Sequence, residues 1–144
     1  MSADITLPAG APEEVVTNAL VRDIDLSAFG GKGSMALITL DNGHDHNRPN
    51  TFGPQSVKAL DAAITDALGR NPAAIAITGK PFIFAAGADL SALSFLNDRN
   101  QSLAIGKLGH DVFRRLGESS IPTFAFINGL ALGGGLEVGL HCNY

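Results

Sequence analysis

Two short runs of almost wholly apolar residues constrain the fold of this chain most strongly. Residues 73–78 read Ala-Ala-Ile-Ala-Ile-Thr, and residues 123–127 read Thr-Phe-Ala-Phe-Ile. Apolar runs of this length, without alternating polar positions, are typical of strands that are covered on both faces. They therefore predict a parallel sheet with helices packed against it.

Two longer stretches carry apolar residues at helical spacing. One begins at Pro54 and ends near residues 69–72, and the other spans residues 101–117. Their apolar positions are Val57, Leu60, Ile64 and Leu68, and Ala104, Leu108, Val112 and Leu116. Proline suits a first helical turn, and Asn100 is expected to cap the second helix. A third helix is predicted over residues 136–141.

The first part of the chain has the pattern of a β-hairpin. A strand is expected within residues 15–26, a glycine turn at residues 30–33 and a second strand at residues 35–40. With the elements above, the predicted order is ββα, βα, βα. This order belongs to an α/β fold.

Two polar or proline-rich segments flank the hairpin. Residues 1–12 carry prolines and a glycine that resist regular structure, so they are predicted to form a flexible tail. Residues 41–55 form a long polar loop, and such loops often bind ligands.

Composition limits the class of protein. The 144 residues are 45% hydrophobic, which is enough for one domain with a real core. The net charge of -4 and the lack of a basic cluster argue against nucleic-acid binding, and no apolar stretch approaches the roughly 20 residues that span a membrane. A single cysteine, Cys142, and the lack of a signal-peptide pattern at the start predict a cytoplasmic protein.

Both apolar strands lead towards glycine-bearing turns. Residues 85–89 read Ala-Ala-Gly-Ala-Asp, and residues 133–135 are three glycines. Small side chains leave backbone N–H groups open to a ligand oxygen, so two such turns can form an oxyanion hole. Glu137, in the first turn of the predicted helix, would supply a general acid or base. The alternatives are that the glycines serve only turns and packing, and that Glu137 only complements the helix dipole.

These residues resemble the crotonase, or enoyl-CoA hydratase/isomerase, family. Residues 78–90 and 127–137 are similar to the two signatures of that family, in the same order. The resemblance implies a crotonase-like ββα spiral, with residues 13–144 as the N-terminal part of the domain. It also assigns the oxyanion hole to the N–H groups of Ala88 and Gly134, and places Ala86, Asp89 and Leu90 along the CoA moiety. Residues 48–52 are a weaker candidate for a loop near the CoA.

The resemblance further implies the reaction. Glu137 matches the first of two catalytic glutamates of hydratases, which add water to trans-2-enoyl-CoA in fatty-acid β-oxidation. The CoA thioester would be the substrate, and no cofactor or metal is expected. The second glutamate is expected beyond Tyr144, so the domain is expected to be truncated and this chain to have little hydratase activity.

The same resemblance suggests partners. Family members form trimers or hexamers, so a homo-oligomer is expected. The signatures are closest to the hydratase part of a multifunctional fatty-acid oxidation α-subunit. An NAD-dependent dehydrogenase portion and a thiolase partner would accompany such a subunit.

Several alternatives stay open. The enzyme could be an isomerase or another member of the superfamily, or the chain could be a noncatalytic acyl-CoA-binding or assembly module. Nucleotide binding at residues 133–135 is disfavoured, because Leu136 and Glu137 follow where a P-loop needs Lys-Ser/Thr. His44 and His46 have no evident third metal ligand, Cys142 is expected in the core, and His110 is expected on a helix surface.

Overall fold

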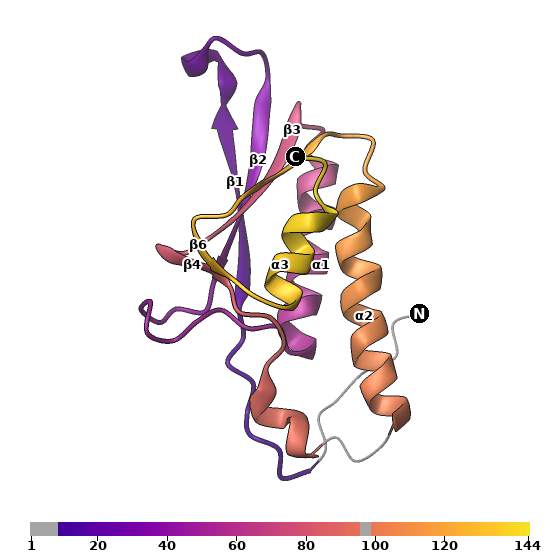
Figure 1. Ribbon diagram of the computed structural model, residues 1–144. Helices are drawn as coiled ribbons and strands as arrows, with labels where there is room; N and C mark the ends of the chain where they lie inside the picture. The colour runs from indigo at the N-terminus through magenta and orange to yellow at the C-terminus, as the bar shows by residue number, and fades with distance from the viewer. Residues whose placement is uncertain (1–8, 96–98) are drawn as a thin grey trace.

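Three successive units of strand, strand and helix build this protein, as the computed structural model in Figure 1 shows for residues 9–95 and 99–144. The first unit holds β1 (Asn18–Asp25), β2 (Ser34–Asp41) and α1 (Pro54–Gly69). The second holds β3 (Ala74–Gly79), β4 (Phe82–Ala85) and α2 (Arg99–Gly117). The third holds β5 (Thr123–Phe126), β6 (Gly129–Ala131) and α3 (Gly134–His141). Two short 3-10 helices, η1 (Leu26–Phe29) and η2 (Leu90–Phe95), lie in the connections.

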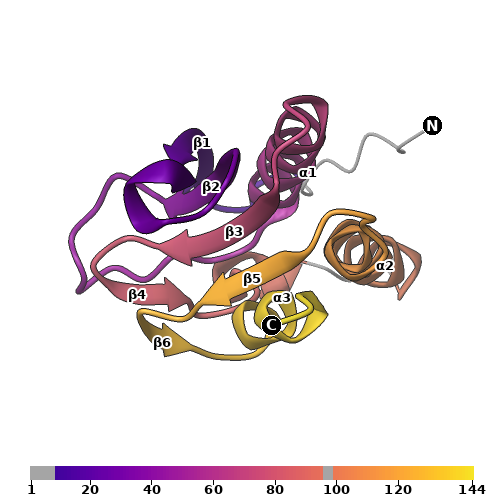
Figure 2. The same ribbon diagram turned by 90° about the horizontal axis from the view of Figure 1, so that it is seen from above.

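The strands form two sheets. The main sheet has the order β1-β2-β3-β5, with β1 antiparallel to β2 and the other neighbours parallel. The remaining strands, β4 and β6, pair in parallel as a second sheet of two strands. Figure 2 shows α1 and α2 side by side along the main sheet, with α3 next to β5. The predicted hairpin and the predicted parallel sheet with helical cover are therefore confirmed.

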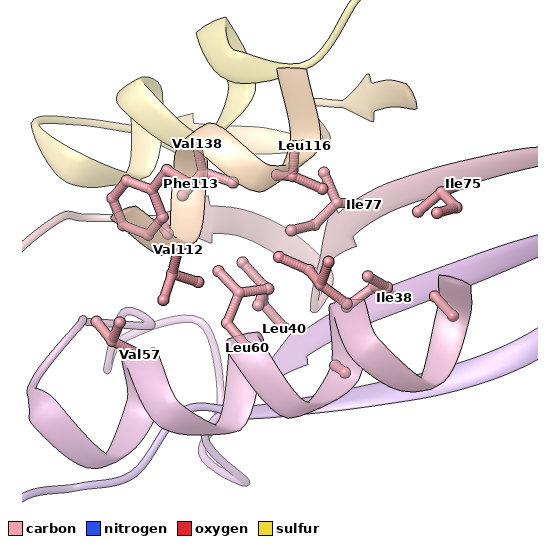
Figure 3. Packing of buried hydrophobic residues seen from close by; sticks show 14 of the residues in the cluster. Ile38, Leu40, Val57, Leu60, Ile75, Ile77, Val112, Phe113, Leu116 and Val138 are labelled. Carbon is pink, nitrogen blue, oxygen red and sulfur yellow. The ribbon is translucent and has the colours of Figure 1, made fainter. Parts of the chain in front are cut away.

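The core lies between the main sheet and the helices, as Figure 3 shows. Ile38 and Leu40 of β2 and Ile77 of β3 are fully buried, and they meet Leu60 from α1 and Leu116 from α2. The apolar face predicted for each long helix is therefore the face that packs into the core. Burial of each such side chain contributes roughly 1.5–3 kcal/mol.

The predicted element order was wrong in one respect. Strands β4 and β6 were not predicted, so the observed order is ββα three times rather than ββα, βα, βα. Both strands are short, with four and three residues, and their sequences show no alternation of polar and apolar positions. Because β4 and β6 pair with each other, only the tertiary fold identifies them as strands.

Helix starts also differ from the predictions. Asn100 lies inside α2, which begins at Arg99, so its role as the cap was wrong. The last helix begins at Gly134 rather than at residue 136. Residues 1–8 of the predicted tail lie outside the described residues.

An acidic residue far away in sequence caps α1. Its N-cap, Gly53, has no side chain, and Glu14 takes that role instead. The Glu14 carboxylate accepts hydrogen bonds from the backbone N–H groups of Gln55 (2.9 Å) and Ser56 (2.8 Å). A carboxylate at this position also interacts favourably with the positive end of the helix dipole. The segment before β1 is therefore tied to the first helix.

Among the helices of residues 9–95 and 99–144, none combines the length and the hydropathy that crossing a bilayer requires.

Candidate functional site

The two glycine turns meet in the structure. Gly87 follows β4 with φ of 93°, a backbone conformation that residues with a side chain rarely adopt. A Cβ atom built on Gly87 would lie 2.9 Å from Gly134 N and 3.4 Å from Gly133 Cα. Because Gly87 has no side chain, the turn after β4 can contact the first residues of α3 directly.

The polar loop orders the first of these turns. Ala86 N donates to Asn50 O at 2.8 Å, Phe52 N to Gly87 O at 2.7 Å, and Asp89 N to Phe52 O at 3.1 Å. These hydrogen bonds pair Phe52 with Ala88 in a short parallel bridge. In such a bridge the neighbours of Ala88 bond to Phe52, so the N–H of Ala88 itself points away from the loop.

Two backbone donors near the contact are left unpaired. Within residues 9–95 and 99–144, neither Ala88 N–H nor Gly134 N–H donates to a protein acceptor. Gly134 is the first residue of α3, where helical N–H groups lack an intrahelical partner. Each donor is free to bind an oxygen atom of a ligand. The structure thus brings the two predicted donor segments together.

Asn50 fixes the loop from inside the protein. Its side chain is fully buried, and its amide group donates to Leu40 O (2.9 Å) and Phe84 O (3.1 Å). Its side-chain oxygen accepts from Asn42 N at 3.1 Å. The ends of β2 and β4 and the loop are therefore held by the Asn50 side chain. The backbone carbonyl of the same residue accepts from Ala86 N.

Lys80 holds the outer part of the same loop. Its side chain is buried, and its ammonium group donates to the carbonyl oxygens of His44 (2.8 Å), Asp45 (2.9 Å) and Arg48 (2.7 Å) and to the side-chain oxygen of Asn42. Burial lowers the pKa of Lys80. This role was not predicted, because a lysine after a strand is normally solvated.

Glu137 lies in the first turn of α3, as predicted. Its side chain is half-exposed, and its Oε1 lies 3.5 Å from His110 Nδ1 and 3.8 Å from His141 Nε2. His141 comes from the last turn of α3, and His110 comes from α2. Sequence reasoning placed His110 on a helix surface, which is correct, but it did not place either histidine beside Glu137.

Aromatic rings border this region. The ring of Phe113 lies 5.4 Å from that of Phe52 and 6.5 Å from that of His141, measured between centroids. Both phenylalanines are buried, and both approach Gly134. The start of α3 therefore packs beside two aromatic rings.

The predicted CoA-lining residues lie beside one another after β4. The carboxylate of Asp89 accepts from Ser91 N (3.0 Å) and Ser91 Oγ (2.7 Å), so it orders the start of η2. Leu90 is exposed. A hollow of about 250 Å³ is lined by Asp89, Ser91 and Arg48, among other residues. The loop at residues 48–52 and the segment after β4 therefore share one surface depression.

Cys142 follows α3, and its thiol is largely buried. This burial raises the pKa of Cys142 to about 11. A thiol with such a pKa stays protonated at neutral pH and is a poor nucleophile. Its predicted role as a packing residue is consistent with its contact with the core.

The comparisons with known proteins agree with these signatures. The model of the enoyl-CoA hydratase/isomerase family matches residues 30–144. The chain belongs to this family. The expected crotonase-type α/β fold is confirmed by solved structures, including enoyl-CoA hydratase from Bacillus anthracis (TM-score 0.71, 24% identity, 88% of this chain and 46% of that one). The Mtb enoyl CoA isomerase is similar too (TM-score 0.69, 26% identity, 86% of this chain and 49% of that one).

The chain is also similar to a curated protein whose name refers to fatty-acid oxidation. The fatty acid oxidation complex subunit alpha of Shewanella loihica is 41% identical over 111 residues, which are 76% of this chain. The predicted resemblance to such α-subunits is therefore confirmed. The matched part is 15% of the length of that relative, and the chain spans about half of the solved structures.

Proposed function

We propose that this family member serves as an enoyl-CoA hydratase of fatty-acid β-oxidation, adding water to trans-2-enoyl-CoA. The contact of Gly87 with Gly134 supports the proposal most directly, since Gly87 directly precedes Ala88 and both proposed donors, Ala88 N–H and Gly134 N–H, lack a protein acceptor in the described part of the chain. The Shewanella loihica relative supports the pathway, because its name assigns it to a fatty acid oxidation complex.

In the proposed reaction, the N–H groups of Ala88 and Gly134 bind the thioester carbonyl oxygen. When the oxygen of water bonds to the β-carbon, the electron pair of the double bond moves towards this carbonyl and forms an enolate. The two donors stabilise the negative charge on the enolate oxygen, and loss of one such donor costs about 3 kcal/mol of transition-state stabilisation.

Glu137 is the proposed general base. Its carboxylate would take a proton from the attacking water, and a proton must then be delivered to the α-carbon to complete the addition. Glu137 is three residues after Gly134 in the same helix, so the base and one donor share a rigid element. In this proposal, a second acid outside the described site supplies the α-carbon proton, and this chain by itself has little hydratase activity.

The segment after β4 is the proposed CoA site. Ala86, Asp89 and Leu90 would line the CoA moiety beside the hollow that Arg48 also borders. Asp89 would act mainly by ordering this segment, since its carboxylate already binds Ser91. Arg48 offers a cation for CoA phosphates.

Isomerisation of an enoyl-CoA is the second candidate. In the described part of the chain, the titratable side chains beside the Glu137 carboxylate are the imidazoles of His110 and His141 rather than a second carboxylic acid. One carboxylate can move a proton from carbon 2 to carbon 4 of a 3-enoyl-CoA without a second acid. The likeness to the Mtb enoyl CoA isomerase is compatible with this reaction.

The decisive experiment compares both substrates in the complete gene product. Loss of ultraviolet absorbance from crotonyl-CoA reports hydration, and its appearance from a 3-enoyl-CoA reports isomerisation. We expect Glu137→Gln to lower the hydration rate at least 100-fold, whereas Glu118→Gln, which changes an exposed glutamate paired with Arg114, should leave it unchanged. Full hydration by Glu137→Gln would refute the role of Glu137.

A noncatalytic module is distinguished by the same experiment. Binding of crotonyl-CoA without either reaction would favour an acyl-CoA-binding or assembly role over the enzyme. Four expectations stay predictions. They are a homo-oligomer, a thiolase partner, a cytoplasmic location and a domain that spans residues 13–144.

A further inference from the structure

His110, Glu137 and His141 form a cluster, of which the proposed hydration uses only Glu137. One potential ligand atom from each residue lies within 4.8 Å of the other two. His110 and Glu137 are exposed, and His141 is partly buried. Two imidazoles and a carboxylate are the ligand set that zinc uses in many sites with three protein ligands.

The backbone suits chelation. Glu137 and His141 are four residues apart on α3 and therefore lie on one face of the helix. The third ligand comes from α2, which packs against α3. Because two ligands come from α3 and one from the neighbouring α2, the backbone already holds the three side chains near one another. Only side-chain rotation is needed to bring the three ligand atoms around one ion.

The candidate ligand atoms would have to move slightly closer together to bind one ion. In a tetrahedral zinc site with bonds of roughly 2.0–2.1 Å, ligand atoms are about 3.4 Å apart. The Glu137 oxygen already lies 3.5 Å from His110 Nδ1 and 3.8 Å from His141 Nε2. His110 is exposed, so its ring can turn towards His141 without disturbing the core. Its ring is already in edge contact with that of His141, at 5.6 Å between centroids.

We propose that His110, Glu137 and His141 bind a divalent transition-metal ion of the zinc class, with a fourth position open to solvent. The carboxylate of Glu137 would then be a ligand of the ion. If the proposed function is correct, metal binding would block the general base, and Zn²⁺ would inhibit hydration reversibly. The binding itself does not depend on that function.

Calorimetric titration of the metal-free chain with ZnCl₂ tests the site directly. We expect one Zn²⁺ per chain, and a loss of affinity of roughly tenfold or more in His110→Ala, His141→Ala and Glu137→Gln. Replacement of Zn²⁺ by Co²⁺ should give the visible absorption of four-coordinate cobalt without a thiolate band. Cys142 is excluded as a ligand in this account, so Cys142→Ser should bind normally.

The matched control is the double variant His44→Ala/His46→Ala. It removes the other two histidines of the chain, which lie on the polar loop, and should keep full affinity. Circular dichroism checks that each variant is folded. Three results would overturn the proposal: no binding, unchanged affinity in the folded His110→Ala and His141→Ala variants, or loss of binding in the double control. Because no turnover is measured, an inactive enzyme would leave the metal result intact.

Discussion

Gly87 is the residue on which the contact between the two turns depends. Its φ of 93° disfavours any side chain, and a Cβ would lie 2.9 Å from Gly134 N. We therefore expect Gly87→Ala to lower the free energy of unfolding by about 2–3 kcal/mol through backbone strain and displacement of α3. It should also weaken acyl-CoA binding. Urea denaturation and calorimetric titration with crotonyl-CoA measure the two effects.

Gly30 provides the matched control for this substitution. It also has a positive φ, of 78°, but a Cβ there would meet no atom within 4 Å. Gly30→Ala should lower the free energy of unfolding only through backbone strain, by about 1 kcal/mol, and should leave thioester binding unchanged. Equal losses of binding in the two variants would contradict the role of the Gly87 contact.

Lys80 is predicted to stabilise the polar loop through its buried ammonium group. In Lys80→Met, three carbonyl oxygens and the Asn42 oxygen lose their donor while the side chain keeps a similar length. We expect a loss of about 2–3 kcal/mol in the free energy of unfolding. Faster hydrogen exchange should appear at residues 42–52.

The control for Lys80 is Lys32→Met, at an exposed position. Lys32 lies in the turn between β1 and β2, so its replacement should change stability little. A neutral effect of Lys80→Met as well would show that the loop does not need these hydrogen bonds.

Residues of the site differ in how well sequence alone predicts them. Ala88, Gly134 and Glu137 could be nominated because they stand inside two contiguous signatures. Lys80 and His110 could not be assigned their contacts, because their partners are about 30 residues away or lie on another helix. Local patterns carry no information on such pairings until the chain is folded.

At the scale of the elements, Glu14 links the first segment to α1. Replacement by alanine leaves the N–H groups of Gln55 and Ser56 without their acceptor. We expect Glu14→Ala to lower the free energy of unfolding by about 1 kcal/mol, which would appear as a lower midpoint of urea denaturation. Glu13→Ala, which changes the exposed neighbouring acid, should have little effect. Equal midpoints for the two variants would exclude the capping role.

The element predictions succeeded where periodicity was long. Helix α1 carries an apolar stripe over four turns, and its observed start at Pro54 agrees with the prediction. Strands β4 and β6 were missed because they have only four and three residues, at or below the shortest run that predicts a strand, and a glycine-bearing turn follows each. Their pairing with each other is a property of the spiral, not of either segment.

At the scale of the whole molecule, the third unit exposes much apolar surface. Large side chains that are at least 39% exposed in this unit and after it are Phe126, Ile127, Leu130, Leu132, Leu136, Leu140 and Tyr144. The edge of β5 is partly occupied, since Tyr144 N donates to Thr123 O and Ala125 N donates to Tyr144 O. Apolar surface of this kind favours association.

We expect this chain to self-associate through the third unit. Leu140 is 76% exposed, so Leu140→Lys should reduce the sedimentation coefficient at a given concentration without loss of folding. Leu103→Lys changes a leucine that is 58% exposed on α2 and serves as the control. Equal effects of both substitutions would indicate nonspecific adhesion instead.

The central claim is that the N–H groups of Ala88 and Gly134 bind one thioester carbonyl oxygen. The most direct test is isotope-edited infrared spectroscopy of crotonyl-CoA that carries ¹³C at the thioester carbonyl. Two preorganised donors should polarise this bond, so its stretching band should move to lower wavenumber on binding. The shift should be absent in Gly87→Ala. A bound thioester whose carbonyl band stays where it lies for free crotonyl-CoA in solution would contradict the account.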